Sequence, residues 1–199
     1  MSFDEFNRRF GKPDRNTAVS LEELGLSHSA PLKSFVSTIG AGSFADGLLS
    51  VASTREADNA VAPWAEFLPI ADARHFATSA LGMLFLLAGD TVWVVETQYG
   101  SVTESTTPLD EFFDLLAEDS VYEERLHASI VRRWTEMMGP IPSQHVLCPQ
   151  PAIALGGAWH LDSLSSISLP TYLGFMAGLF SHSGDNAVII NRAPNDPHP

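Results

Sequence analysis

The chain has 199 residues, of which 45% are hydrophobic and 18% charged, so it can bury an apolar core and general disorder is excluded. Its 24 acidic residues outnumber 11 basic ones, and a net charge of -13 repels phosphate backbones and anionic lipid surfaces. We therefore expect no direct binding to nucleic acid or membrane, whereas a cationic protein would be attracted at long range.

The order of helix and strand signals predicts an α+β protein. Apolar residues at helical spacing, with capping and stop residues, predict helices at about 3–10, 31–39, 56–66, 109–116, 122–138 and 171–180. Runs of β-branched and aromatic residues between turn signals predict strands at about 48–51, 81–87, 91–97, 101–104, 152–155 and 187–190. The strands between 81 and 104 form a meander, and its apolar run Val92–Val95 indicates a sheet covered on both faces.

A glycine-rich loop at 40–47 invites a phosphate-binding interpretation. Gly40-x-Gly42 follows a predicted helix and precedes a predicted strand, the reverse of the order that aims backbone amides at phosphate. Because no Gly-Lys-Ser/Thr follows either, we interpret the pair as a tight turn.

The nearest pattern to a metal or catalytic cluster is His145-x-x-Cys148, with His160 and Asp162 downstream. These residue types can bind zinc, but no second paired motif accompanies them, and the sequence has no Gly-x-Ser-x-Gly or His-Glu-x-x-His motif. We therefore predict no metal, no cofactor and no catalytic residue. A hydrolase would need these four side chains to converge in a cleft.

Acidic residues concentrate where two predicted helices adjoin. Seven carboxylates fall within fifteen residues and are the candidate partner-binding residues: Asp110, Glu111, Asp114, Glu118, Asp119, Glu123 and Glu124. Two interpretations stay open, a solubilising face whose acids suit helix N-termini or a surface that binds a cationic partner.

Between Met137 and Gly184 the only formally charged residue is Asp162, and aromatic and methionine side chains such as Trp159 and Phe175 recur. Such a stretch forms core or an apolar surface that a partner covers. Helical spacing favours core for most of these aromatic and methionine side chains, which are Trp159, Tyr172, Phe175, Met176 and Phe180.

The expected compartment is the cytoplasm. Cys148 is the single cysteine, so no internal disulfide can form, and the acidic N-terminus lacks the pattern of a secretory signal. The long uncharged stretches contain prolines and serines and do not resemble membrane spans.

Six short motifs carry a family resemblance, and the match covers nearly all of residues 3–182. They are Phe10-Gly11-Lys12-Pro13, Gly40-x-Gly42-Ser43-Phe44-x-Asp46-Gly47-Leu48, Trp64-x-x-Phe67-Leu68-Pro69, Leu84-Phe85 with Val92-Trp93-Val94, Leu109-x-x-Phe112-Phe113, and Pro151-Ala152-x-Ala154-Leu155-Gly156-Gly157. In this order they resemble the Tdi-type immunity proteins of type VI secretion DNase effectors, a bacterial family with a GAD-like N-terminal region.

The resemblance implies a non-enzymatic inhibitor that binds the nuclease domain of a cognate DNase toxin and protects the producing cell and its kin. It implies structural roles and no active site for the motif residues Gly40, Gly42, Phe44, Asp46, Gly47, Gly156 and Gly157. No inhibitory residue carries over from it.

We expect one α+β immunity domain at 1–190, with a central, largely antiparallel sheet packed by helices and an order of elements similar to the SUKH-like class. The resemblance divides it into a GAD-like part at about 1–100 and a Tdi-type part at about 101–190, and a flexible tail is expected at 191–199. The alternative function is a small regulatory or ligand-binding module, in which the loop at 40–47 and the uncharged C-terminal region enclose a metabolite.

Overall fold

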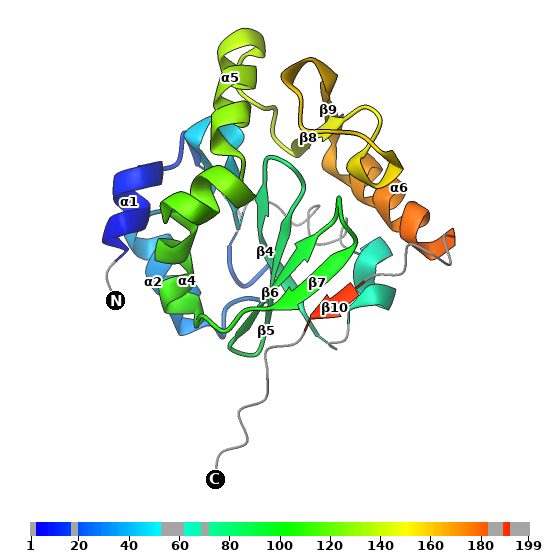
Figure 1. Ribbon diagram of the computed structural model, residues 1–199. Helices are drawn as coiled ribbons and strands as arrows, with labels where there is room; N and C mark the ends of the chain where they lie inside the picture. The colour runs from blue at the N-terminus through cyan, green and yellow to red at the C-terminus, as the bar shows by residue number, and fades with distance from the viewer. Residues whose placement is uncertain (1–2, 17–19, 53–61, 69–71, 183–188, 192–199) are drawn as a thin grey trace.

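A β-sheet runs through the middle of the molecule in the computed structural model, which describes residues 3–16, 20–52, 62–68, 72–182 and 189–191 (Figure 1). Its strands lie in the order β1 (Arg15–Asn16), β2 (Gly42–Phe44), β3 (Leu49–Val51), β4 (Arg74–Ser79), β5 (Leu84–Ala88), β6 (Thr91–Glu96), β7 (Ser101–Glu104) and β10 (Ile189–Asn191). Neighbouring strands are antiparallel, except that β10 pairs with β7 in parallel. The predicted meander is present as β5, β6 and β7, and the predicted α+β class with a largely antiparallel sheet is confirmed.

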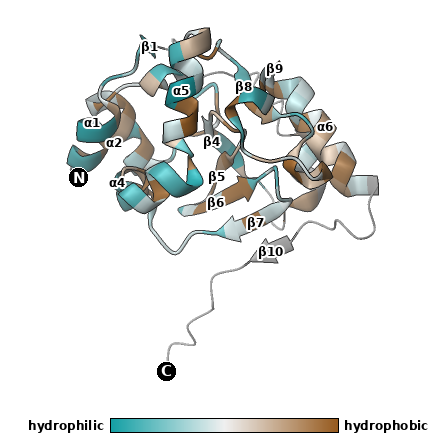
Figure 2. Cartoon of the chain, turned by 45° about the horizontal axis from the view of Figure 1, so that its top comes forward, coloured by the Kyte–Doolittle hydropathy of each residue, from teal (hydrophilic) through white to brown (hydrophobic). Residues whose placement is uncertain are grey.

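The central strands bury both of their faces. In β6, Val92 and Val94 pack in one core cluster and Trp93 and Val95 pack in another, and each of the four is at most 6% exposed. Because successive side chains of a strand point to opposite faces, this division places one hydrophobic core on each side of the sheet. The hydrophobic middle strands are visible in Figure 2, and the prediction of a covered sheet is confirmed.

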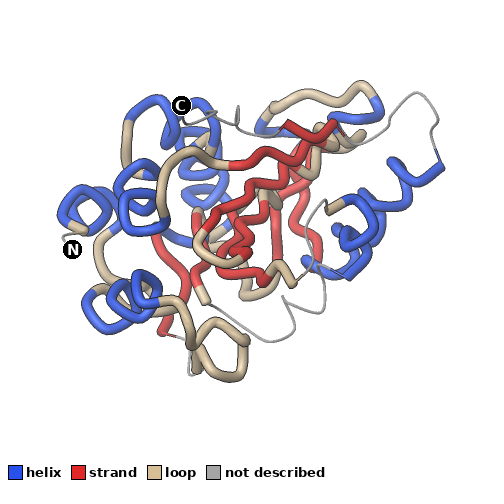
Figure 3. Tube along the Cα trace, turned by 90° about the horizontal axis from the view of Figure 1, so that it is seen from below, coloured by secondary structure: helices blue, strands red, loops and turns tan. Residues whose placement is uncertain are grey.

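Helices lie on both sides of the sheet (Figure 3). The first core lies beneath α1 (Asp4–Phe10), α2 (Ala30–Thr38), α4 (Leu109–Leu116) and α5 (Ala128–Met138). The second lies beneath α6 (Leu169–His182), the small sheet of β8 (His145–Pro149) with β9 (Leu164–Ser168), and η2 (Ala62–Phe67). Short helical segments complete the fold: η1 (Ala45–Gly47), η3 (Ser120–Arg125), η4 (Ile153–Leu155) and η5 (Leu161–Ser163). Among the described residues, no helix is long and apolar enough to cross a membrane.

Phenylalanine rings join three helices to one another and to the sheet. Phe35 of α2 stacks on Phe113 of α4 with ring centroids 3.7 Å apart. Phe6 of α1 meets these two rings edge-on, at 4.9 and 5.8 Å, and lies 5.3 Å from Phe44 of β2. All four side chains are fully buried, and such aromatic pairs contribute about 0.5–1.5 kcal/mol each beyond their buried area. The cluster therefore holds α1, α2 and α4 as one layer.

Two aromatic rings of α6 rest on glycines of the sheet. Tyr172 lies against Gly82 and Phe180 lies against Gly100, and a Cβ atom at either glycine would collide with the ring. Both glycines have positive φ angles, 80° and 62°. The hydroxyl of Tyr172 lies 2.5 Å from Thr97 Oγ1, and burial raises the pKa of this phenol. The absence of a side chain at these two turns therefore decides how closely α6 approaches the sheet.

The helix predicted over 122–138 is interrupted. Residues Ser120–Arg125 form the π-helix η3, and α5 begins only at Ala128, because His127 has a left-handed backbone with φ 51°. The apolar spacing continues across this break, and for that reason periodicity predicted a single helix.

The strand predicted at 152–155 is wrong. Ile153–Leu155 form a 3-10 turn, and Gly156 follows it with a φ of 84°. A Cβ atom at Gly157 would collide with the carbonyl oxygen of Pro151, so the chain doubles back on itself here. The apolar run at 152–155 therefore forms a turn and not a strand, because Gly156 and Gly157 allow the backbone to approach Pro151 this closely.

Five strands, β1, β2, β4, β8 and β9, are additional to the predicted ones. β8 lies in a segment that its prolines made resemble a connector, and it pairs with β9 from Pro149↔Leu164 to His145↔Ser168. No turn signal joins β8 directly to β9, so the local sequence pattern does not reveal that these two strands pair.

Three predictions fall partly outside the described residues. Of the strand predicted at 187–190, residues 187 and 188 lie outside, and the described part belongs to β10, which begins at Ile189. Of the helix predicted at 56–66, residues 56–61 lie outside, and the described continuation Ala62–Phe67 is the 3-10 helix η2. The tail predicted at 191–199 begins with the last residue of β10, and residues 192–199 lie outside.

Substitution of Gly82 by alanine tests the contact between α6 and the sheet. Gly82→Ala should lower the free energy of unfolding by about 3 kcal/mol, because left-handed backbone strain adds to a collision with Tyr172. Gly89→Ala is the matched control, since Gly89 has a φ of 58° and nothing within 4 Å of its Cβ position, and should cost only about 1 kcal/mol. Urea denaturation measures both values, and equal losses would contradict the packing argument.

Candidate functional site

A groove of about 420 Å³ lies between α1 and the outward face of α4, and we name it the acidic groove. Its ionisable lining consists of five carboxylates and two guanidinium groups: Glu5, Arg8, Arg9, Glu111, Asp114, Glu118 and Asp119. The opposite face of α4 is buried in the first core, so helical periodicity turns the acidic residues outward. The hydrophilic outer surfaces of α1 and α4 are visible in Figure 2.

Two carboxylates of this groove hold α1 against α4. Asp114 Oδ1 accepts a hydrogen bond of 2.9 Å from the backbone N–H of Phe6, in the first turn of α1. Asp119 forms an ion pair with Arg9, whose guanidinium also lies 4.7 Å from the ring centre of Tyr122. Asp114 and Asp119 therefore stabilise the walls of the groove.

A third carboxylate of the acidic run caps α5. Glu123 Oε2 accepts hydrogen bonds from the backbone N–H and the hydroxyl of Ser129, at 3.2 and 2.5 Å. The residue at the N-cap position, His127, makes no side-chain capping bond. Glu123 therefore caps the N-terminus of α5, where the side chain of the N-cap residue accepts no hydrogen bond from the backbone N–H groups.

The other four predicted partner-binding residues are Asp110, Glu111, Glu118 and Glu124. Asp110 is half-buried and the other three are exposed, and the described residues offer none of the four a hydrogen-bonding or ionic partner. The structure therefore divides the seven carboxylates into three that stabilise the fold and four whose charge is available to a partner.

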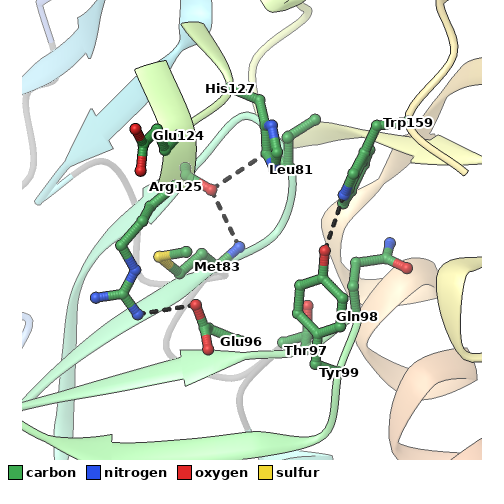
Figure 4. A pocket seen from close by; sticks show the side chains of 11 residues that line it. Leu81, Met83, Glu96, Thr97, Gln98, Tyr99, Glu124, Arg125, His127 and Trp159 are labelled. Atoms are coloured by element: carbon green, nitrogen blue, oxygen red, sulfur yellow. Dashed lines mark hydrogen bonds and ion pairs between the residues drawn. The ribbon is translucent and has the colours of Figure 1, made fainter. Parts of the chain in front are cut away.

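A second hollow of about 160 Å³ opens beside the turn at 79–83, and we name it the aromatic hollow (Figure 4). Trp159 Nε1 donates a hydrogen bond of 3.0 Å to the hydroxyl of Tyr99, and the two rings stand together on one side. Across from them, Arg125 forms an ion pair of 2.8 Å with Glu96. The hollow thus combines an aromatic wall with a charged wall.

Two apolar side chains and a histidine complete the aromatic hollow. Leu81 and Met83 line it, and the Ser79 hydroxyl shapes their turn by accepting both of their backbone N–H groups, at 3.3 and 3.1 Å. The ring of His127 lies 5.1 Å from that of Trp159, and burial lowers the pKa of this imidazole. His127 is therefore neutral at pH 7.

Sequence reasoning missed the aromatic hollow as a site. Tyr99 and Trp159 are 60 positions apart, and the sequence contains no motif that joins them. The available signal was a tyrosine at the tip of a predicted hairpin turn, where aromatic side chains have little to pack against.

The glycine-rich motif at 40–47 forms β2 and η1, the first part of a β2–η1–β3 hairpin. Gly40, Gly42 and Gly47 have positive φ angles, as does Asp46, which is exposed. Phe44 is fully buried, and neither hollow described above is lined by this segment. These residues hold structural positions, as do Gly156 and Gly157 at the turn after η4.

The residues that a metal or hydrolase site would need are not brought together. His145 and Cys148 both lie on β8 but three positions apart, so their side chains point to opposite faces. Cys148 is buried, its Sγ lies 3.7 Å from Gln98 Nε2, and burial raises the pKa of the thiol. His160 and Asp162 are both exposed, and the described residues contain no group of three side chains suited to holding a metal.

The described part of the uncharged stretch from Met137 to Gly184 is divided between core and surface. Tyr172 and Met176 of α6 are fully buried beneath the helix. Four large hydrophobic side chains of the stretch are exposed: Met137, Met138, Leu155 and Phe175, at 66%, 67%, 53% and 46%.

The fold matches that of a bacterial protein of known structure. The crystal structure of Atu4351 from Agrobacterium tumefaciens is similar with a TM-score of 0.68 over 88% of each chain, at 13% sequence identity. At this identity the likeness shows a shared fold alone. No model of a known protein family matches the chain, and no curated protein matches its sequence significantly.

Removal of the Asp114 carboxylate tests its structural role. Asp114→Ala should lower the free energy of unfolding by about 1–2 kcal/mol, because the backbone N–H of Phe6 loses its charged acceptor. Glu118→Ala, on the same helix, should change it by less than about 0.5 kcal/mol. Urea unfolding monitored by tryptophan fluorescence compares the two, and equal effects would contradict the division between structural and available carboxylates.

Acidification tests the burial of His127. Because its pKa is lowered from 6.5, the unfolded state takes up the proton first, and stability present above pH 6.5 is lost as the pH falls below it. Asparagine suits the left-handed backbone at position 127. As the pH falls from about 7.5 to about 5.5, the free energy of unfolding of His127→Asn should therefore rise relative to that of the wild type. His28→Asn, at an exposed position, controls for the loss of a histidine. A difference between wild type and His127→Asn that does not change with pH would contradict the prediction.

Proposed function

We propose that this protein is an immunity protein of a type VI secretion DNase effector. It acts in the cytoplasm as a non-enzymatic inhibitor that binds the nuclease domain of its cognate toxin one to one, and so protects the producing cell and its kin from DNA degradation. The observation that carries the proposal is the set of carboxylates along α4 and η3 for which the described residues provide no partner, in a chain of net charge -13.

Charge complementarity supports a DNase as the partner. A DNase has to attract a phosphate backbone, so its DNA-binding cleft carries a positive potential. The acidic groove has five carboxylates and two guanidinium groups in its lining, so it stays negative after its ion pairs with Arg8 and Arg9 are formed. Glu111 and Glu118 present the surplus charge at the surface, where it can accelerate association.

The groove is also formed before any partner arrives. Asp114 connects α1 to α4, Asp119 connects α1 to the start of η3, and the phenylalanine cluster holds α1 and α4 from beneath. A preformed surface loses little conformational entropy on binding, which favours the tight complex that inhibition requires.

The resemblance to the immunity family also supports the proposal, because the residues that carry it occupy structurally constrained positions. Its motifs coincide with positions under backbone or packing constraint, such as Gly11, which ends α1 with a φ of 71°, and the buried Phe44. These positions specify the scaffold, while the charged surface would specify the partner.

Inhibition is tested with the nuclease domain encoded beside this gene. Purified protein should abolish DNA cleavage at one equivalent and form a stable complex on size-exclusion chromatography. If cleavage and elution both stay unchanged, the proposed pairing fails and a ligand-binding module becomes the better interpretation.

Charge reversal tests the role of the groove. The double variant Glu111→Lys, Glu118→Lys should slow association with the nuclease domain by about tenfold or more at low salt and flatten its salt dependence, because steering depends on complementary charge. Glu22→Lys, Asp90→Lys changes the net charge equally at exposed positions outside the groove and is the matched control. Stopped-flow kinetics compare the two, and equal rates would place the interface elsewhere.

A further inference from the structure

The aromatic hollow has an exposed aromatic face that is held in place. Tyr99 is 51% exposed, yet its hydroxyl accepts the hydrogen bond from Trp159 Nε1, and the Trp159 ring lies beside that of His127. A ring that is both accessible and immobilised offers contact area at little entropic cost, as binding hot spots do.

The charge around this face is negative. Glu96 and Glu124 both line the hollow, and Arg125 is engaged by Glu96 through the ion pair of 2.8 Å. His127 adds no positive charge at pH 7, because burial lowers its pKa. Glu96 is itself engaged, because its Oε1 pairs with Arg125 and its Oε2 accepts a hydrogen bond of 2.8 Å from the Ser101 hydroxyl. A cation that enters the hollow therefore meets one carboxylate that is unpaired among the described residues, that of Glu124.

The hollow also lies next to the acidic groove along the chain. Asp119 lines the groove and Glu124 lines the hollow, and both belong to the short stretch that leads from α4 through η3. One protein partner lying along this stretch can reach both sites.

We propose that the aromatic hollow receives an arginine side chain from the protein that binds the acidic groove, with the guanidinium plane against the Tyr99 ring and its charge attracted by the carboxylate of Glu124. This inference rests on the proposed function and adds a second point of contact to it. Leu81 and Met83 provide an apolar surface for the methylene groups of the arginine, and a volume of about 160 Å³ suits one side chain. A guanidinium group is flat and weakly hydrated, so it stacks on an aromatic ring more readily than an ammonium group does.

The experiment measures the affinity of the full-length protein for the nuclease domain by isothermal titration calorimetry. Tyr99→Ala should weaken binding by about tenfold, and Glu124→Gln by about threefold to tenfold. Tyr99→Phe keeps the ring face but loses the hydrogen bond from Trp159, so it should weaken binding less than Tyr99→Ala does. Met137→Ala is the control, because Met137 is 66% exposed on α5 and does not line the hollow. Glu124 is exposed and its side chain has no partner among the described residues, so Glu124→Gln keeps the test valid if Tyr99→Ala unfolds.

The outcomes separate this inference from the function on which it rests. Arginines of the nuclease domain are replaced one at a time by glutamine, and each variant is titrated with the wild type and with Tyr99→Ala. An arginine whose replacement weakens binding to the wild type, but does not weaken binding to Tyr99→Ala any further, is the one that enters the hollow. Its detection supports the inference. If the wild type binds, charge reversal in the groove weakens binding, and both hollow variants bind within twofold of the wild type, the inference is overturned while the proposed function stands. If the wild type does not bind the nuclease domain, both fail.

Discussion

The stack of Phe35 on Phe113 is the contact on which the position of the acidic surface depends. Phe113 lies on the buried face of α4, and at 3.6 residues per turn the position of that face decides where every other side chain of the helix points. With Phe113 held between the sheet and α2, Glu111 and Glu118 have to face solvent beside α1. The hydrophobic interior thus sets the geometry of a charged surface that it does not touch.

Carboxylates that are equivalent in the sequence have different roles because their neighbours differ. Asp114 faces the free N–H groups at the start of α1, and Glu123 faces those at the start of α5, so both satisfy backbone groups that a helix leaves unpaired. Glu118, between them in the sequence, faces the groove and has no such donor among the described residues. A partner would therefore meet a surface in which structural and available charges alternate along one segment.

Local signals predicted the elements that are defined locally. The phenylalanine spacing of α1, the cap and stop of α2, the amphipathic pattern of α4 and the turns of the β5–β7 meander all depend on residues within one or two turns of each other. The errors arose where distant parts of the chain decide the structure. β8 is a strand because β9 pairs with it, and the segment after Pro151 is a turn because Gly157 packs against it.

For function, the sequence by itself determined the sign and the location of the charge: a strongly acidic chain with a carboxylate run between 110 and 124 on helical spacing. These properties are sums over residues and follow from composition and order. Only the tertiary structure decided which carboxylates are available to a partner, and that Tyr99 and Trp159 share one hollow across 60 positions. The physical reason is that availability depends on which donors lie within hydrogen-bonding distance, and the packing of the two cores brings those donors into place.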